Sequence, residues 1–118
     1  MTTQDFKRKI TAIFSADVKG YSRLMGTDEL ATIETLKKYR EIMATLIQKQ
    51  RGRVVDSPGD NVMAEFASVV DALQCAVDIQ KQLKIKNDEL PENRRMEFRI
   101  GVNLGDVLRM ERESMVTE

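Results

Sequence analysis

The chain has 118 residues, enough for one compact domain with a single core and too few for two domains of usual size. Nineteen basic residues balance nineteen acidic ones, so charge does not favour a nucleic acid or an anionic membrane as partner. Histidine is absent, which excludes a histidine-based catalytic triad or zinc site. Carboxylates, lysines and backbone amides are left for any chemistry.

Cysteine usage and the N-terminus bear on the compartment. The lone Cys75 lies within an apolar helical pattern, so a disulfide framework is excluded and a buried thiol in a reducing compartment is expected. The apolar run from Ile10 is too short for a signal peptide or a membrane span. The sequence therefore predicts a cytoplasmic protein without a membrane segment.

The first predicted element is a strand over residues 9–18, KITAIFSADV, where apolar residues run with little polar alternation. A long helix follows, with Thr27 as its expected N-cap and Gly52 as its end. The apolar side chains of this helix recur at helical spacing at Leu30, Ile33, Leu36, Met43, Leu46 and Ile47.

The second half of the chain predicts a hairpin, a helix and a strand. The runs 53–57 and 61–66 are joined through Pro58 and Gly59, which favours a hairpin. Ser68 opens a helix that is expected to stop before Pro91. Residues 96–104, MEFRIGVNL, alternate strictly between apolar and polar. The expected inner face of the helix is Ala72, Leu73, Ala76, Val77, Ile79 and Leu83.

The resulting order, βαββαβ, is typical of an α+β ferredoxin-like sandwich, with a four-stranded antiparallel sheet and two helices on one face. In that topology the first strand is central and the third is its antiparallel neighbour. The end of the first strand, at Asp17, then lies beside the start of the third, at Asp60. The fold, rather than local sequence, is expected to bring these two carboxylates together.

Two neighbouring carboxylates repel each other, and a divalent cation between them is the simplest remedy. Ligands that are all oxygen favour Mg²⁺ or Mn²⁺ over zinc. Next to Asp17, Gly20 lets the backbone turn into a helix start whose amides can hold a phosphate. Metal and phosphate together indicate a nucleotide. In the alternative interpretation, Asp17 and Asp60 are solvated turn residues.

Four segments, FSADVKGYSRLM, GRVVDSPGDNVMAEF, VVDALQCAVDIQ and FRIGVNLGDVL, together resemble the catalytic domain of class III adenylate and guanylate cyclases. The resemblance covers residues 8–108. It implies a two-metal reaction that converts a purine nucleoside triphosphate to the cyclic monophosphate and pyrophosphate. It also implies roles for seven positions: Asp17, Asp60 and the Val18 carbonyl as metal ligands, Gly20, Tyr21 and Ser22 as the turn around the triphosphate, and Asp56 as the residue facing the base.

Asp56 falls where the family often has a base-reading Lys or Glu. A carboxylate there can accept hydrogen bonds from guanine or from the adenine amino group, so either base is compatible, and ATP is expected ahead of GTP. Alternatively, Asp56 only pairs with a nearby Lys or Arg.

The chain departs from the family after Val107, where an Asn and an Arg that contact ribose and phosphates are expected across a dimer. Residues 109–118 instead read RMERESMVTE, so we expect a single, partial cyclase domain with little or no turnover. Apolar surface left uncovered would favour a homodimer or a domain-swapped oligomer.

One hypothesis for this tail is a shifted reading frame. A possible coding sequence for residues 110–118, read one nucleotide earlier, encodes Asp-Gly-Glu-Arg-Ile-Tyr-Gly-Asp-Gly, which is the family's segment. The alternative is a divergent helix or strand extension.

Two other functions are compatible with the predicted fold. A catalytically silent nucleotide-binding or dimerisation module would keep the fold and the metal-binding acids without the chemistry. A ferredoxin-like regulatory or RNA-binding module is less favoured, because no aromatic pair occupies the predicted open strand positions.

Overall fold

The computed structural model describes the backbone of residues 6–55 and 57–110 and the side chains of residues 11–55 and 57–105. Its elements in chain order are β1 (Phe6–Val18), α1 (Tyr21–Thr27), α2 (Glu29–Lys49), β2 (Arg53–Val55), β3 (Val62–Phe66), α3 (Val69–Asp88), the 3₁₀ turn η1 (Glu92–Arg94) and β4 (Phe98–Met110).

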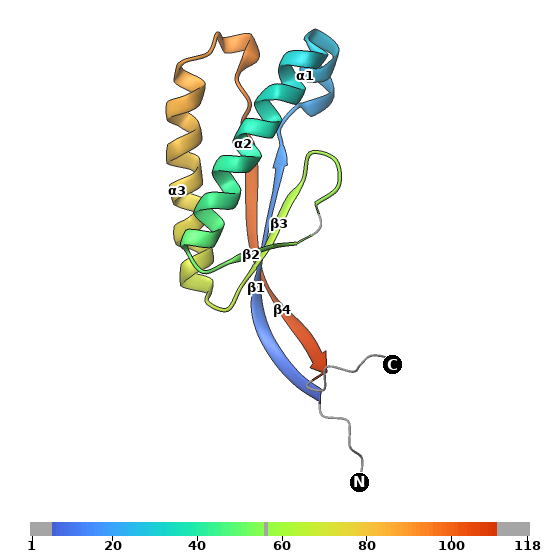
Figure 1. Ribbon diagram of the computed structural model, residues 1–118, viewed down its shortest axis with the longest axis vertical. Coiled ribbons are helices and arrows are strands. Elements are labelled where there is room, and N and C mark those ends of the chain that lie inside the picture. The colour runs from blue at the N-terminus through green and yellow to red at the C-terminus, as the bar shows by residue number, and fades with distance from the viewer. Residues whose placement is uncertain (1–5, 56, 111–118) are drawn as a thin grey trace.

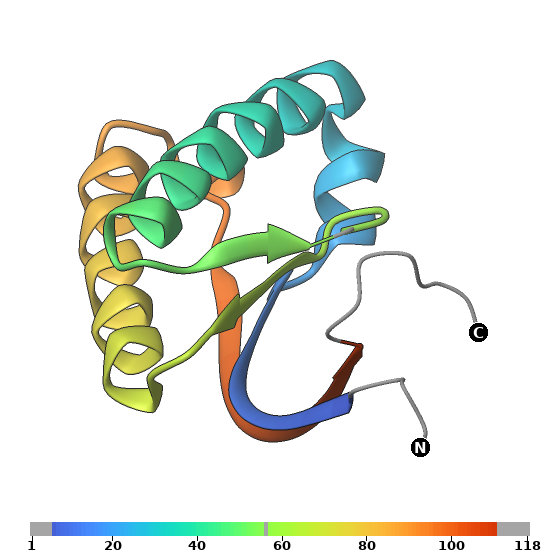
Figure 2. The same ribbon diagram turned by 60° about the horizontal axis from the view of Figure 1, so that its bottom comes forward.

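The strands form one antiparallel sheet in the order β2-β3-β1-β4, and α2 and α3 lie together on one face of it (Figures 1 and 2). This confirms the predicted ferredoxin-like α+β sandwich. Ala16 of β1 pairs with Val62 of β3, and Asp17 pairs with Arg99 of β4. The end of β1 therefore meets the start of both neighbouring strands.

The core lies between the sheet and the two long helices. Phe14 of β1 and Phe66 of β3 are fully buried and pack with their ring centroids 6.1 Å apart and their planes tilted. Burial of side chains of this size supplies most of the stabilisation, at roughly 1.5–3 kcal/mol each. The helices contribute Met43, Ile47, Cys75, Ile79 and Leu83.

The predicted inner face of α3 was partly wrong. Leu73 is 51% exposed and Val77 is 47% exposed, although both were assigned to the core. Cys75 takes their place, and its predicted burial is confirmed. Ala72, Cys75, Ile79 and Leu83 follow one another at spacings of three and four, which is the stripe that a helix turns toward a single neighbour.

The start of the long helix also differs from the prediction. Thr27 ends α1 and Asp28 caps α2, with its carboxylate accepting a hydrogen bond from the Ala31 amide at 3.1 Å. Asp28 has extended backbone angles, so its carboxylate can reach the unpaired amides of the first turn. Leu30 and Ile33, which fitted the apolar pattern, are exposed on the outer side of α2.

Strands β1 and β4 are longer than the predicted 9–18 and 96–104. Their pairing continues to Phe6 and Met110, beyond the part covered by the helices (Figure 1). Leu104 is 66% exposed because no helix of the described chain covers that part of β4. Of the segment predicted to be atypical, residues 109–110 belong to β4 and residues 111–118 lie outside the described residues.

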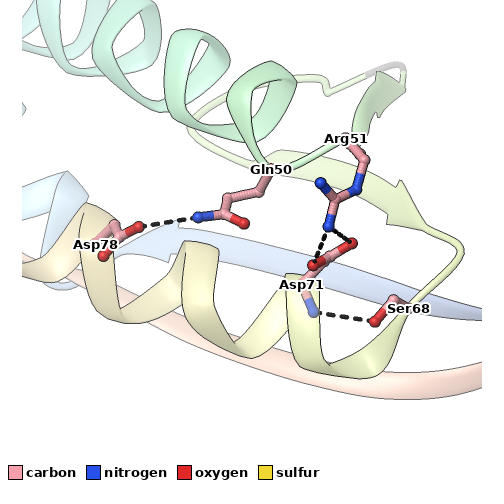
Figure 3. Close-up of polar contacts among 5 residues, drawn as sticks. All are labelled: Gln50, Arg51, Ser68, Asp71 and Asp78. Carbon is pink, nitrogen blue, oxygen red and sulfur yellow. Dashed lines mark hydrogen bonds and ion pairs between the residues drawn. The ribbon is translucent and has the colours of Figure 1, made fainter.

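A cluster of polar side chains, the helix-end cluster, joins the end of α2 to α3 (Figure 3). Arg51 donates to both carboxylate oxygens of Asp71, at 2.9 and 3.0 Å. Gln50 donates to Oδ2 of Asp78 at 3.2 Å, and Ser68 accepts from the Asp71 amide. These contacts fix the helices at the end of the helical layer away from α1 (Figure 1).

Candidate functional site

The structure brings the loop before β3 into contact with the end of β1. The Val18 amide donates a hydrogen bond to Oδ2 of Asp60 at 3.0 Å. The antiparallel register explains the contact, since Val62 lies opposite Ala16 and the residues that follow and precede them are forced together. Asp60 is thereby held next to Asp17.

Asp17 faces β4 rather than the helices. Its Oδ2 accepts a hydrogen bond from a terminal nitrogen of Arg99 at 2.6 Å, which is the cross-strand pair expected from the register. This hydrogen bond and the charge of Asp17 raise the pKa of Arg99, and the charge of Asp60 raises it further. Both carboxylates thus act on the same guanidinium group.

The structure shows one engaged oxygen on each of the two site carboxylates, Asp17 and Asp60. Among the side chains described, residues 11–55 and 57–105, neither Oδ1 atom has a hydrogen-bond partner. The side chains are partly exposed, so a hydrated cation can reach them. An oxygen pair of this kind is suited to an ion that keeps several waters.

The turn after β1 is built around Gly20. Its φ of 66° lies in the left-handed region that favours glycine, and it serves as the N-cap of α1 without a side-chain hydrogen bond. Tyr21 packs partly against the core and Ser22 is exposed. An open depression of about 780 Å³ lies beside the turn, lined by Lys19, Gly20, Arg23, Glu92, Asn93, Arg95 and Glu97.

Six of the seven predicted site residues lie together in the structure, and the seventh falls outside the described residues. Asp17, Val18 and Asp60 are in direct or adjacent contact, and Gly20, Tyr21 and Ser22 continue from them along the chain. Asp56 lies outside the described residues.

Sequence reasoning missed Arg99. Only the β1–β4 register reveals it, because that register places position 99 opposite position 17.

The donor set fits a hard divalent cation. Within the described residues no three carboxylate or thiol groups gather, so the pair would act with a backbone carbonyl, water and substrate phosphates. That arrangement is usual for Mg²⁺, which demands octahedral geometry and gives up its waters reluctantly. The single thiol, Cys75, is in the core and contributes nothing to this site.

Comparison with known proteins shows which family the chain resembles. The model of the adenylate and guanylate cyclase catalytic domain matches residues 3–111. The chain belongs to this family. A protein of Rhizobium meliloti (strain 1021) named "Putative adenylate cyclase 3" is 40% identical over 109 residues, which make up 92% of this chain and 19% of that protein.

Solved cyclase structures share the fold. An adenylate/guanylate cyclase/hydrolase from Silicibacter pomeroyi is 33% identical with a TM-score of 0.78, covering 97% of this chain and 66% of its own. A bacterial light-regulated adenylyl cyclase is 24% identical with a TM-score of 0.79, covering 88% of this chain and 32% of its own; it bears on the fold alone.

The cyclase domain described here is only part of its relatives. The chain spans about a fifth of the curated Rhizobium protein and about two thirds of the Silicibacter structure. No helix among the described residues is both long and apolar enough to cross a bilayer.

Proposed function

We propose that this cyclase domain binds a purine nucleoside triphosphate, ATP in preference to GTP, and takes part in its conversion to the 3′,5′-cyclic monophosphate and pyrophosphate. The observation that carries the proposal is the meeting of Asp17 and Asp60 where the central strands β1 and β3 end and begin, each with one oxygen that no described side chain engages. The name of the Rhizobium relative, "Putative adenylate cyclase 3", supports ATP.

In this proposal Asp17, Asp60 and the carbonyl of Val18 hold Mg²⁺ or Mn²⁺. When bound, such ions supply Lewis-acid activation of the ribose 3′-hydroxyl and neutralise charge on the phosphates. The chain's own part is to fix the two carboxylates. β1 does this for Asp17 through its pairing with β4, and the Val18 amide does it for Asp60.

The turn at Gly20, Tyr21 and Ser22 is proposed to wrap the triphosphate. Its support is the left-handed Gly20, which turns the chain directly after the acid, and the neighbouring cations. Lys19, Arg23 and Arg95 line the depression beside the turn together with Glu92 and Glu97, so its cations outnumber its acids by one, which suits a polyanion. Asp56 is proposed to face the base.

Residues 1–118 alone are expected to bind nucleotide weakly and to turn over little or none, because they lack the Asn and Arg of the family segment that follows Val107. The test is to incubate the protein with Mn²⁺ and ATP or GTP, measuring nucleotide binding by calorimetry and cyclic product by chromatography. Metal-dependent binding that is lost in Asp17→Ala and Asp60→Ala, and kept in the surface variant Glu34→Gln, supports the site. Binding that ignores metal and both aspartates contradicts it.

A second candidate is a catalytically silent nucleotide-binding or dimerisation module. Metal-dependent binding without cyclic product would favour it, provided that a chimera supplying the family segment after Val107 is also inactive. Joining residues 1–108 to the C-terminal third of an active relative separates the two. A cyclase half-site regains turnover in such a chimera, whereas a silent module does not.

We propose that the domain works in the cytoplasm, and as a homodimer or an oligomer that exchanges elements. Exposed apolar side chains at Val54 and Leu104 of the sheet support association. Light scattering coupled to size exclusion tests it, since a monomer at all concentrations contradicts the proposal.

A further inference from the structure

One arginine of α2 contacts the loop that carries Asp60. A terminal nitrogen of Arg40 donates to the backbone carbonyls of Ser57 at 3.1 Å and Asn61 at 2.7 Å, and it also contacts the carbonyl of Gly59. These three carbonyls belong to a single five-residue segment, residues 57–61, called here the Asp60 loop. Two of them, Gly59 and Asn61, are the immediate neighbours of Asp60.

Among the described residues, the other hydrogen bonds of the Asp60 loop are the Val18–Asp60 bond and bonds within the hairpin. The Asn61 amide donates to the Pro58 carbonyl at 3.3 Å, and Ser57 Oγ joins the Val55 carbonyl to the Met63 amide. Gly59 has a φ of 67°, a conformation that glycine adopts without strain. These bonds shape the turn but do not attach it to the helical layer. Arg40 supplies that attachment.

Arg40 is itself fixed in place. It follows the buried Tyr39 on α2, and Tyr39 donates to the buried Asn87 of α3 at 2.6 Å. Among the residues that the structure describes, the Nε of Arg40 is buried and has no hydrogen-bond partner, so the contacts of this guanidinium with the loop are made by its terminal nitrogen. All three contacts come from one terminal nitrogen, and the planar guanidinium holds this nitrogen in a fixed orientation, whereas the ammonium group of a lysine rotates freely.

We propose that Arg40 is a positioning residue for the metal site: by holding the carbonyls on both sides of Asp60, it fixes the carboxylate that the Val18 amide then orients. The inference rests on the proposed metal-binding role of Asp60. Loss of a partner that supports a metal ligand typically weakens metal affinity about 10–100-fold. We expect Arg40→Met to weaken Mn²⁺ binding about tenfold and Arg40→Lys to restore part of it.

The experiment is a Mn²⁺ titration followed by electron paramagnetic resonance, with Arg53→Met as the matched control. Arg53 is an exposed arginine of β2 that pairs with Glu65. Its replacement by Met removes one positive charge near the same sheet without touching the Asp60 loop, so it controls for the change in charge alone. If Arg40 acts through Asp60, Arg40→Met has no further effect in an Asp60→Asn background. Equal weakening in both backgrounds, or unchanged affinity in Arg40→Met, overturns the inference. A wild-type chain that does not bind Mn²⁺ contradicts the proposed function instead.

A measurement without metal keeps the two failures apart. The Val18 amide is bonded to the Asp60 carboxylate, so its hydrogen exchange reports whether the loop is in place. Arg40→Met is expected to speed exchange at Val18 about tenfold or more, with Arg53→Met unchanged. Unaltered exchange at Val18 overturns the positioning role whatever the metal result.

Discussion

The helix-end cluster and the candidate site use aspartates in opposite ways. Arg51 engages both carboxylate oxygens of Asp71, and Gln50 engages one oxygen of Asp78 (Figure 3). Gln74 donates to the other oxygen of Asp78. Asp17 and Asp60 each have one oxygen engaged, among the side chains described. Carboxylates with both oxygens bonded tie elements together, whereas carboxylates with one bonded oxygen at the ends of central strands are available to a ligand. The difference separates structural acids from candidate functional ones.

The largest effect is expected from the site carboxylates. Asp17→Asn and Asp60→Asn should each weaken Mn²⁺ binding by at least about a hundredfold, because losing a ligand costs more than losing its supporting partner. Thermal stability should change little, since both side chains are partly exposed. A Mn²⁺ titration beside a thermal melt checks both. Destabilisation with intact Mn²⁺ affinity would assign these aspartates to the structural class.

The next effect concerns the buried thiol of Cys75, which lies near the charge of Asp78. Burial, with a smaller contribution from Asp78, raises the pKa of Cys75 from its ordinary 9.0 to about 11. At pH 8 the thiolate is then about a hundredfold scarcer than in the unfolded chain, and labelling by a disulfide reagent should slow accordingly. Labelling at the rate of an unfolded control would contradict the buried position.

The same pKa shift gives a pH dependence of stability. In the unfolded state the thiol loses its proton near pH 9, whereas in the folded state it keeps it. The free energy of unfolding therefore falls as the pH rises. The contribution of Cys75 is fully present below pH 9 and is lost between pH 9 and about 11, by roughly 1–3 kcal/mol. Denaturation at stepped pH, compared with Cys75→Ala, isolates it. If the free energy of unfolding of Cys75→Ala changes with pH as steeply as that of the wild type, Cys75 is not the source of the pH dependence.

A smaller effect is expected at Arg99, whose side chain contacts Asp17. A resident cation facing both site carboxylates repels a second cation, so Arg99→Gln should tighten Mn²⁺ binding about three- to tenfold in the absence of nucleotide. The gain should shrink at high salt. Weaker binding in Arg99→Gln would mean that the arginine mainly orients Asp17.

The smallest effect is expected in the helix-end cluster. Asp71→Asn loses the charge of an ion pair whose arginine is largely exposed, and it should cost about 0.5 kcal/mol of unfolding free energy. Mn²⁺ affinity should stay the same, in contrast to Asp60→Asn. Chemical denaturation and the same titration check it, and a change in metal affinity would break the distinction between the two regions.

Much of the fold could be predicted because its signals are local. The apolar run around Phe14, the alternation around Phe98 and the Ser68 cap each depend on a few consecutive residues. Errors arose where tertiary packing decides. Leu73 and Val77 are as apolar as core residues, but α3 turns a stripe centred on Cys75 and Ile79 toward the sheet.

The site followed the same division. Asp17 and Asp60 could be paired from topology, because antiparallel neighbours bring a strand end beside a strand start. Arg99 required the residue-level register of β1 and β4, and Arg40 required the path of a loop over a helix. Neither is visible in periodicity or spacing.

The central claim is that Asp17 and Asp60 together bind a divalent cation, and paramagnetic relaxation tests it most directly. Substoichiometric Mn²⁺ should broaden the amide signals of Val18, Gly20 and Asp60 and leave those of Asp71 and Asp78 sharp. Broadening confined to other carboxylates, or spread evenly over the surface, would contradict the account.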